Sequence, residues 1–126
     1  MNAHGEYEIK KDGFIVHVYP AGAFNYEGII ELKSEVLNIV STEKKWVLFG
    51  HHTNQAFVIP EALDALIDAF NEYALHGCIA IFQEASTVRA DTLEKLVKPS
   101  VNIPFEINDD KNLLLVRARE AFERSD

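Results

Sequence analysis

Two adjacent histidines, His51 and His52, are the residues of this sequence whose type most readily suggests chemistry. An imidazole can bind a metal ion or transfer a proton near neutral pH. Neighbouring residues of an extended segment point in opposite directions, however, so one metal ion rarely binds both. His17 and His76 lie elsewhere in the sequence, and no His-Glu-x-x-His or His-x-His spacing occurs. The sequence therefore predicts no metal site and favours a solvated loop for this pair.

The segment that follows the two histidines carries further side chains suited to binding. It comes directly after an apolar run at residues 45–49, and ligands of open α/β sheets gather at the carboxyl ends of such strands. We therefore predict a binding surface composed of His51, His52, Thr53, Asn54, Phe57, Pro60 and Glu61. An alternative is an enzyme or small-molecule sensor that uses loops at the strand ends, with a site composed of His51, His52, Gln83 and Glu84.

No signature of a nucleophilic or cofactor-dependent enzyme is visible. Cys78 is the single cysteine, which excludes an intrachain disulfide, and it begins an apolar run without an assignable base. The glycine-rich patterns that bind nucleotides and the Gly-x-Ser-x-Gly pattern of hydrolases are not found. Ser86 and Thr87 precede a predicted helix with Arg89 in its first turn, an arrangement explained by capping or, alternatively, by anion binding. The sequence thus predicts no catalytic residue and no cofactor.

Alternating apolar patterns place these residues on a regular series of strands and helices. Strands are predicted at residues 7–11, 14–19, 45–49, 78–82 and 104–108, with a hairpin turn at Asp12-Gly13. Helices are predicted at residues 26–42, 60–76 and 87–98, and from Asp109 or Asp110 to about Arg124. In the second helix, the apolar face is predicted to consist of Leu63, Leu66, Ile67, Phe70 and Ala74.

This order predicts an α/β fold. Strands that alternate with helices form a mostly parallel sheet, and the opening hairpin adds an antiparallel strand. We expect a single domain over residues 1–126 with a mixed, mostly parallel five-stranded sheet and about four helices. No internal repeat, linker or low-complexity segment suggests a second domain.

Composition and charge narrow the classes of partner. The 126-residue chain has a formal net charge of −8, which argues against nucleic acid as a direct partner. No apolar run approaches the roughly 20 residues of a transmembrane helix, and the N-terminal residues lack the apolar core of a secretory signal. The expected location is therefore the cytoplasm.

The layout resembles the STAS domain, the fold of sulfate-transporter cytoplasmic domains and of anti-sigma-factor antagonists. The features that carry this resemblance are the opening hairpin, the apolar strand at residues 46–49, the strand–helix units at residues 57–77 and 78–98, and the last strand leading into an acidic-capped helix. STAS members that act as partner switches have an Asp-Ser-Ser-Gly-like motif at the start of the second helix, with a serine that the partner kinase phosphorylates. Here the stretch at residues 58–62 has no hydroxyl, and Glu61 falls near the phosphoacceptor position.

Glu61 has two interpretations. A carboxylate in the first turn of a helix is favoured by the helix dipole, which explains the residue without any function. Under the STAS resemblance, Glu61 instead mimics a permanently phosphorylated serine. Other STAS-like proteins bind lipids or small hydrophobic ligands between helix and sheet, which suits a chain without a phosphoacceptor.

Taken together, the residues and the resemblance favour a non-catalytic binding or regulatory module of the STAS-like type. It is expected to recognise a protein partner or an apolar, lipid-like ligand near the start of the second helix. The enzyme or sensor remains the alternative function, and a homodimer is a further possibility for the assembly.

Overall fold

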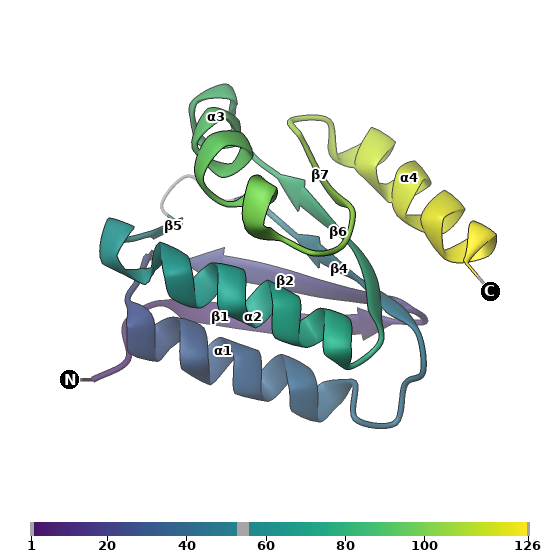
Figure 1. The fold of residues 1–126 in the computed structure, drawn as a ribbon, viewed down its shortest axis with the longest axis horizontal. Helices are drawn as coiled ribbons and strands as arrows, with labels where there is room; N and C mark the ends of the chain where they lie inside the picture. Colours follow the sequence, from purple (N-terminus) through teal and green to yellow (C-terminus); the bar gives the residue numbers. More distant parts are fainter. Residues whose placement is uncertain (1, 53–55, 126) are drawn as a thin grey trace.

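The computed structural model describes residues 2–52 and 56–125, which form a five-stranded sheet and four α-helices (Figure 1). The strands of this sheet are β1 (Glu6–Asp12), β2 (Ile15–Ala21), β4 (Trp46–Gly50), β6 (Cys78–Glu84) and β7 (Phe105–Asn108). The helices are α1 (Tyr26–Ile39), α2 (Leu63–Leu75), α3 (Thr87–Leu96) and α4 (Lys111–Arg124). Two 3₁₀ turns, Pro60–Ala62 and Lys98–Ser100, precede α2 and follow α3. The predicted α/β class and the alternation of elements are confirmed.

The strands pair in the order β1-β2-β4-β6-β7. β1 runs antiparallel to β2, whereas β2, β4, β6 and β7 run parallel to one another, as predicted. The carboxyl ends of the four parallel strands therefore lie along one edge of the sheet, which we call the carboxyl edge. Ligands of open parallel sheets bind outside this edge.

The hairpin turn lies one residue later than predicted. Asp12 pairs with Ile15, so the two loop residues are Gly13 and Phe14. Gly13 has a φ of +59°, which suits the first central position of a type II′ turn. Phe14 lies beyond the strand and stacks on Phe122 of α4, with 3.9 Å between the ring centroids.

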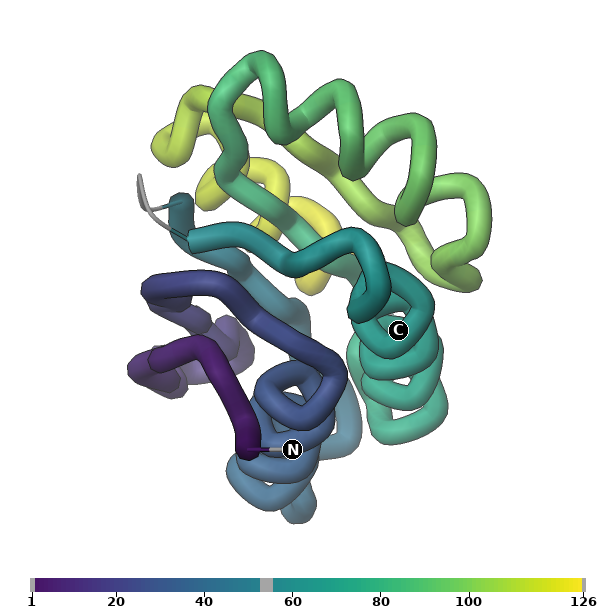
Figure 2. The backbone as a smooth tube through the Cα atoms, turned by 90° about the vertical axis from the view of Figure 1, so that its left-hand side faces the viewer, coloured from purple at the N-terminus to yellow at the C-terminus, as the bar shows by residue number. Residues whose placement is uncertain are grey.

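Side chains alternate along β4 and contribute to two hydrophobic cores, one on each face of the sheet. Trp46 and Leu48 belong to the core beneath α1 and α2, which we call the helix-face core. Val47 and Phe49 belong to a second core beneath α4, which we call the α4-face core. Figure 2 shows α1 and α2 side by side against one face of the sheet, with α4 on the other. All residues of β4 are buried, because the strand is covered on both faces, and its sequence is therefore continuously apolar.

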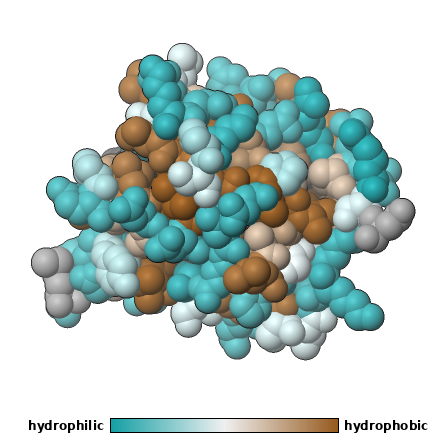
Figure 3. All heavy atoms as spheres, in the orientation of Figure 1, coloured by the Kyte–Doolittle hydropathy of each residue, from teal (hydrophilic) through white to brown (hydrophobic). Residues whose placement is uncertain are grey.

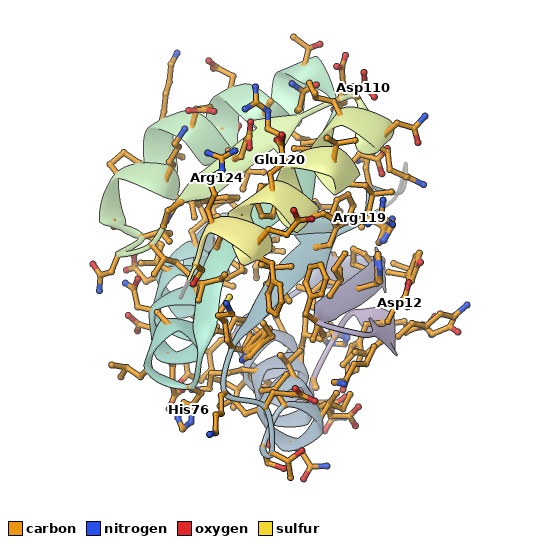
Figure 4. The ribbon with its side chains drawn as sticks, turned by 90° about the vertical axis from the view of Figure 1, so that its right-hand side faces the viewer. Asp12, His76, Asp110, Arg119, Glu120 and Arg124 are labelled. Atoms are coloured by element: carbon orange, nitrogen blue, oxygen red, sulfur yellow. The ribbon has the colours of Figure 1, made fainter. Side chains whose placement is uncertain are left out.

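Both ends of α4 are held by polar contacts. The Asp110 side chain accepts a hydrogen bond from the backbone N–H of Leu113 at 3.1 Å, which confirms the predicted cap. At the other end, the Lys45 ammonium donates to the backbone oxygens of Phe122 and Ser125, where a cation complements the helix dipole. Figure 4 shows α4 lying across this face of the sheet, with Asp110 at its start and Arg124 near its end.

A second, two-stranded sheet was not predicted from the sequence. β3 (Ala23–Phe24) and β5 (Phe57–Val58) pair in parallel, so that the segment before α2 lies beside the segment before α1. The backbone N–H of Phe57 donates to the oxygen of Gly22 at 3.1 Å. This pairing fixes the chain at the carboxyl edge immediately after the undescribed residues 53–55.

β6 extends two residues beyond its predicted end. Gln83 and Glu84 were expected in a loop, but they pair with Ile107 and Asn108 of β7. The ladder continues because its hydrogen bonds use backbone groups, which do not depend on the polarity of the side chains. None of the helices in the described parts of the chain has the length and apolar character needed to cross a membrane.

Candidate functional site

A cavity of about 330 Å³ lies between the sheet and the helices of the helix face. Its interior is apolar and is lined by Val18, Phe24, Ile29, Leu32, Leu48, Leu63, Leu66, Ala69, Phe70, Tyr73 and Leu93. Its mouth lies at the carboxyl edge and is lined by Gly50, His51, His52, Phe57, Gln83, Glu84, Arg89 and Thr92. The site therefore combines an apolar interior with a polar rim, the usual composition of a small-ligand pocket.

The cavity explains part of the difference between the predicted and the observed burial of α2. The predicted apolar face included Leu63 and Leu66, but both are only half-buried because they border the cavity. The deeply buried residues of α2 are Ala65, Ala69, Phe70 and Tyr73. Of the two buried alanines, Ala69 lines the cavity, where its small side chain leaves space that a leucine would fill. Apolar side chains also reach the surface near the middle of this face, with hydrophilic ones around them (Figure 3).

Polar groups at the mouth are tied to the backbone of the carboxyl edge. The Gln83 amide donates to the backbone oxygens of Gly50 at 3.2 Å and Glu84 at 2.9 Å. The backbone N–H of His52 donates to the Glu84 carboxylate at 3.0 Å. Gly50 permits this arrangement, because a Cβ at that position would collide with the Gln83 side chain. These hydrogen bonds make this side of the mouth polar.

Arg89 and Phe57 face each other across the mouth. The Arg89 guanidinium carbon lies 5.9 Å from the centroid of the Phe57 ring, within the range of a cation–π contact. Phe57 is 48% exposed, so this apolar ring stands at the surface. Arg89 was noted in the sequence only as a first-turn residue of α3, and its place at the cavity mouth could not be predicted.

The predicted binding residues are distributed around this mouth. His51, His52 and Phe57 line the cavity. Pro60 and Glu61 are exposed in the 3₁₀ turn that precedes α2, rather than in the first turn of α2 itself. Two further members of the predicted set, Thr53 and Asn54, lie outside the described residues.

His51 is buried, contrary to the prediction of a solvated loop pair. It is 5% exposed, and its ring stacks on Tyr19 with 4.0 Å between centroids. Its Nε2 shares a hydrogen bond of 2.8 Å with Nδ1 of His17. The reason is that His51 continues the inward alternation of β4 and packs beside Phe49 of the α4-face core. Only half-buried His52 retains the predicted accessibility.

Burial controls the protonation of the two paired histidines. Burial, with smaller contributions from nearby His17 and Lys111, lowers the pKa of His51 to about 4. Burial also lowers the pKa of His17, with Asp12 opposing this shift and Arg119 and Lys111 adding to it. The Nδ1 atom of His51 has no hydrogen-bond partner among the described residues. The pair is therefore neutral at pH 7. The sequence analysis did not predict that His17 pairs with His51. The alternation along residues 14–19 does place His17 on the same strand face as Ile15 and Tyr19.

Two other ionisable groups on the helix face are held in their neutral forms. Tyr73 is 3% exposed and lines the cavity, and burial raises its pKa above the usual range. Burial also raises the pKa of the Cys78 thiol to about 12. A thiol that stays protonated is a poor nucleophile, so Cys78 acts as a small apolar residue of the core.

The described residues offer no arrangement typical of metal binding. They contain no group of three or more His, Cys, Asp or Glu side chains that could hold a metal ion. The four residues of the enzyme or sensor alternative do line the mouth, but the His51 ring packs with Tyr19 and His17, and Gln83 is bonded to the backbone.

Comparison with solved structures finds seven matching chains. One is the crystal structure of an anti-sigma factor antagonist from Mycobacterium paratuberculosis. It is 14% identical, with a TM-score of 0.63, and the match covers 92% of this chain and 95% of that one. No protein-family model and no curated protein matches the sequence. At this identity the likeness concerns the fold alone, and this chain has the STAS-like fold that the sequence resemblance implied.

Proposed function

We propose that this protein is a non-catalytic binding module that takes an apolar, lipid-like ligand into the cavity between its helices and its sheet. The observation that carries the proposal is the cavity itself, with its apolar interior and its polar mouth at the carboxyl edge. Its volume of about 330 Å³ falls within the range of roughly 300–1,000 Å³ that is usual for small-ligand pockets. Each methylene group transferred from water into such an interior contributes about 0.8 kcal/mol.

Calorimetric titration with decanol tests this function, because the alcohol has an apolar chain and no charge. We expect saturable binding of one decanol per chain. Ala69→Leu adds three carbons inside the cavity and should displace a similar part of the ligand chain, which weakens binding roughly fifty-fold.

Ala74→Leu is the matched control, because Ala74 lies on the same helix outside the cavity lining. This variant should bind decanol like the unaltered protein. If the unaltered protein shows no saturable binding, or if both leucine variants bind equally well, the cavity is not the ligand site.

A second candidate function is recognition of a protein partner at the surface beside the mouth. The observations that favour it are the exposure of Phe57, Pro60 and Glu61 at adjoining positions. The structurally similar protein from Mycobacterium paratuberculosis is an anti-sigma factor antagonist, which suggests the same kind of regulatory partner here. Under this proposal, Glu61 supplies the negative charge that a phosphorylated serine supplies in partner-switching STAS domains.

Affinity capture with the unaltered protein and with Glu61→Ala tests the partner hypothesis. We expect the recovery of a specific protein to change in Glu61→Ala. Asp64→Ala is the control, since Asp64 is another exposed carboxylate near the start of α2. Equal recovery from all three proteins would remove the role proposed for Glu61.

A further inference from the structure

The cavity mouth holds a cation that lacks an acidic partner within the described chain. Arg89 projects from α3 and lines the mouth, where it contacts the Phe57 ring. The ion pairs of the described residues involve other basic side chains, among them Lys95 with Asp91 on the same helix. The carboxylate of the rim residue Glu84 accepts a hydrogen bond from the backbone N–H of His52 instead. The guanidinium can therefore accept a new anion without first releasing a carboxylate.

The first turn of α3 offers further donors at the same place. Ser86 is the residue before α3, and its side chain forms no capping hydrogen bond. The first backbone N–H groups of a helix lack partners within the helix and attract anions. Ala85 and Arg89, on either side of this turn, both line the cavity. The positive end of α3 and the guanidinium therefore border the same mouth.

Acidic groups limit how much negative charge this mouth tolerates. The Glu84 carboxylate belongs to the rim, and the chain as a whole carries a formal net charge of −8. A singly charged head pairs with one guanidinium through two parallel hydrogen bonds, whereas a doubly charged phosphate adds repulsion from Glu84. The balance of charges favours a carboxylate.

We propose that the ligand is a single-chain amphiphile with a carboxylate head, held by Arg89 at the mouth while its alkyl chain occupies the apolar cavity. This inference rests on the proposed function, since it adds the head group to the ligand of the same site. The residues of α2 that line the cavity run from Leu63 to Tyr73, a distance of about 15 Å along the helix. This length gives an extended alkyl chain room to lie with its far end near Tyr73 and its head beside Arg89.

Decanol and decanoate, which share a chain length, separate the two proposals. We expect decanoate to bind about tenfold more tightly than decanol at pH 7, because a charge-assisted pair with Arg89 adds to the same chain burial. Arg89→Met should remove this preference, so that decanoate and decanol bind the variant with similar affinity. Arg89→Lys should restore part of it, because lysine keeps the charge but not the paired hydrogen bonds. Decyl phosphate should bind the unaltered protein more weakly than decanoate.

Arg119→Met is the matched control, because Arg119 is exposed on α4 on the far side of the sheet (Figure 4). It should retain the full preference for decanoate. Binding of decanol and decanoate with equal affinity, an undiminished preference in Arg89→Met, or tighter binding of decyl phosphate would overturn the carboxylate proposal while leaving the cavity as a ligand site. If neither decanol nor decanoate binds, the proposed function itself is contradicted.

Discussion

The buried His51 makes the stability of this protein sensitive to pH at the scale of a single residue. Its pKa is about 4 in the folded chain, against 6.5 for an unperturbed imidazole. Between these values the unfolded chain binds a proton that the folded chain does not. The free energy of unfolding therefore falls as the pH drops from 6.5 to 4, by up to about 3 kcal/mol from this residue. Burial lowers the pKa of His17 as well, which acts in the same direction.

Urea unfolding of the unaltered protein and of His51→Phe over this pH range measures the effect. The phenylalanine variant lacks the titrating group and should lose less stability on acidification. His76→Gln controls for the loss of an exposed histidine and should follow the unaltered protein. Identical pH slopes for the unaltered protein and His51→Phe would show that His51 is not the responsible residue.

The Asn25 side chain forms hydrogen bonds with several segments of the chain. Its removal should therefore lower the free energy of unfolding more than the removal of an ordinary helix cap. Its buried side-chain oxygen accepts hydrogen bonds from the backbone N–H groups of Gly28 at 2.9 Å and His4 at 2.8 Å. Its amide also donates to the backbone oxygen of Asn2. We expect Asn25→Ala to lower the free energy of unfolding by about 2 kcal/mol or more. The exposed cap Asp110 is the control, and Asp110→Ala should cost about 1 kcal/mol. Equal losses in urea unfolding would contradict this ranking.

Residue types alone predicted some of these environments and missed others. Cys78 begins an apolar run, which is typical of a buried strand, and it is buried. The burial of His51 was missed because its neighbours Tyr19 and His17 come from a strand more than thirty residues earlier in the chain. Arg89 was noticed as a first-turn residue, but its position over Phe57 depends on how α3 and β5 meet. Contacts between distant segments have no local signal in the sequence.

At the scale of elements, α4 should be required to seal the second face of the sheet. Leu114 is completely buried in the α4-face core, whereas its neighbour Leu113 is 38% exposed. Leu114→Ala should lower the free energy of unfolding by about 2–5 kcal/mol, since it removes a buried side chain and leaves a void. Leu113→Ala, the matched control, should cost much less. Similar losses for the two variants in urea unfolding would mean that α4 does not pack as described.

The elements that the sequence predicted well are those with a strong local pattern. The continuous apolar run of β4 and the acidic cap of α4 each specified an element near its observed bounds. The pairing of the two-residue strands β3 and β5 was missed, since they are too short for any alternation to be visible. They pair with each other only because α1 and α2 begin at the same edge of the sheet. A ligand site between helix and sheet was implied only by the STAS resemblance, and its lining residues could not be predicted, because the space over the sheet depends on how α2 is rotated.

At the scale of the whole molecule, β4 joins the two hydrophobic cores. Its residues contribute alternately to the helix-face core and the α4-face core, and it pairs with β2 and β6. Neither core can lose its packing without exposing one face of the same strand. The cavity lies within only one of the two layers. A ligand that fills it would stabilise the packing of the helix-face core directly and that of the α4-face core through the sheet.

This shared strand predicts that the chain unfolds in a single cooperative transition. Trp46 is the single tryptophan and is completely buried in the helix-face core, so its fluorescence reports on that layer. Far-ultraviolet circular dichroism reports on all four helices, including α4 on the opposite face. Because small proteins with one connected interior usually unfold in two states, the two signals should change at the same urea concentration. An earlier change in Trp46 fluorescence, with much of the helical signal retained, would show that the helix-face layer opens independently of α4 and that β4 does not couple the cores.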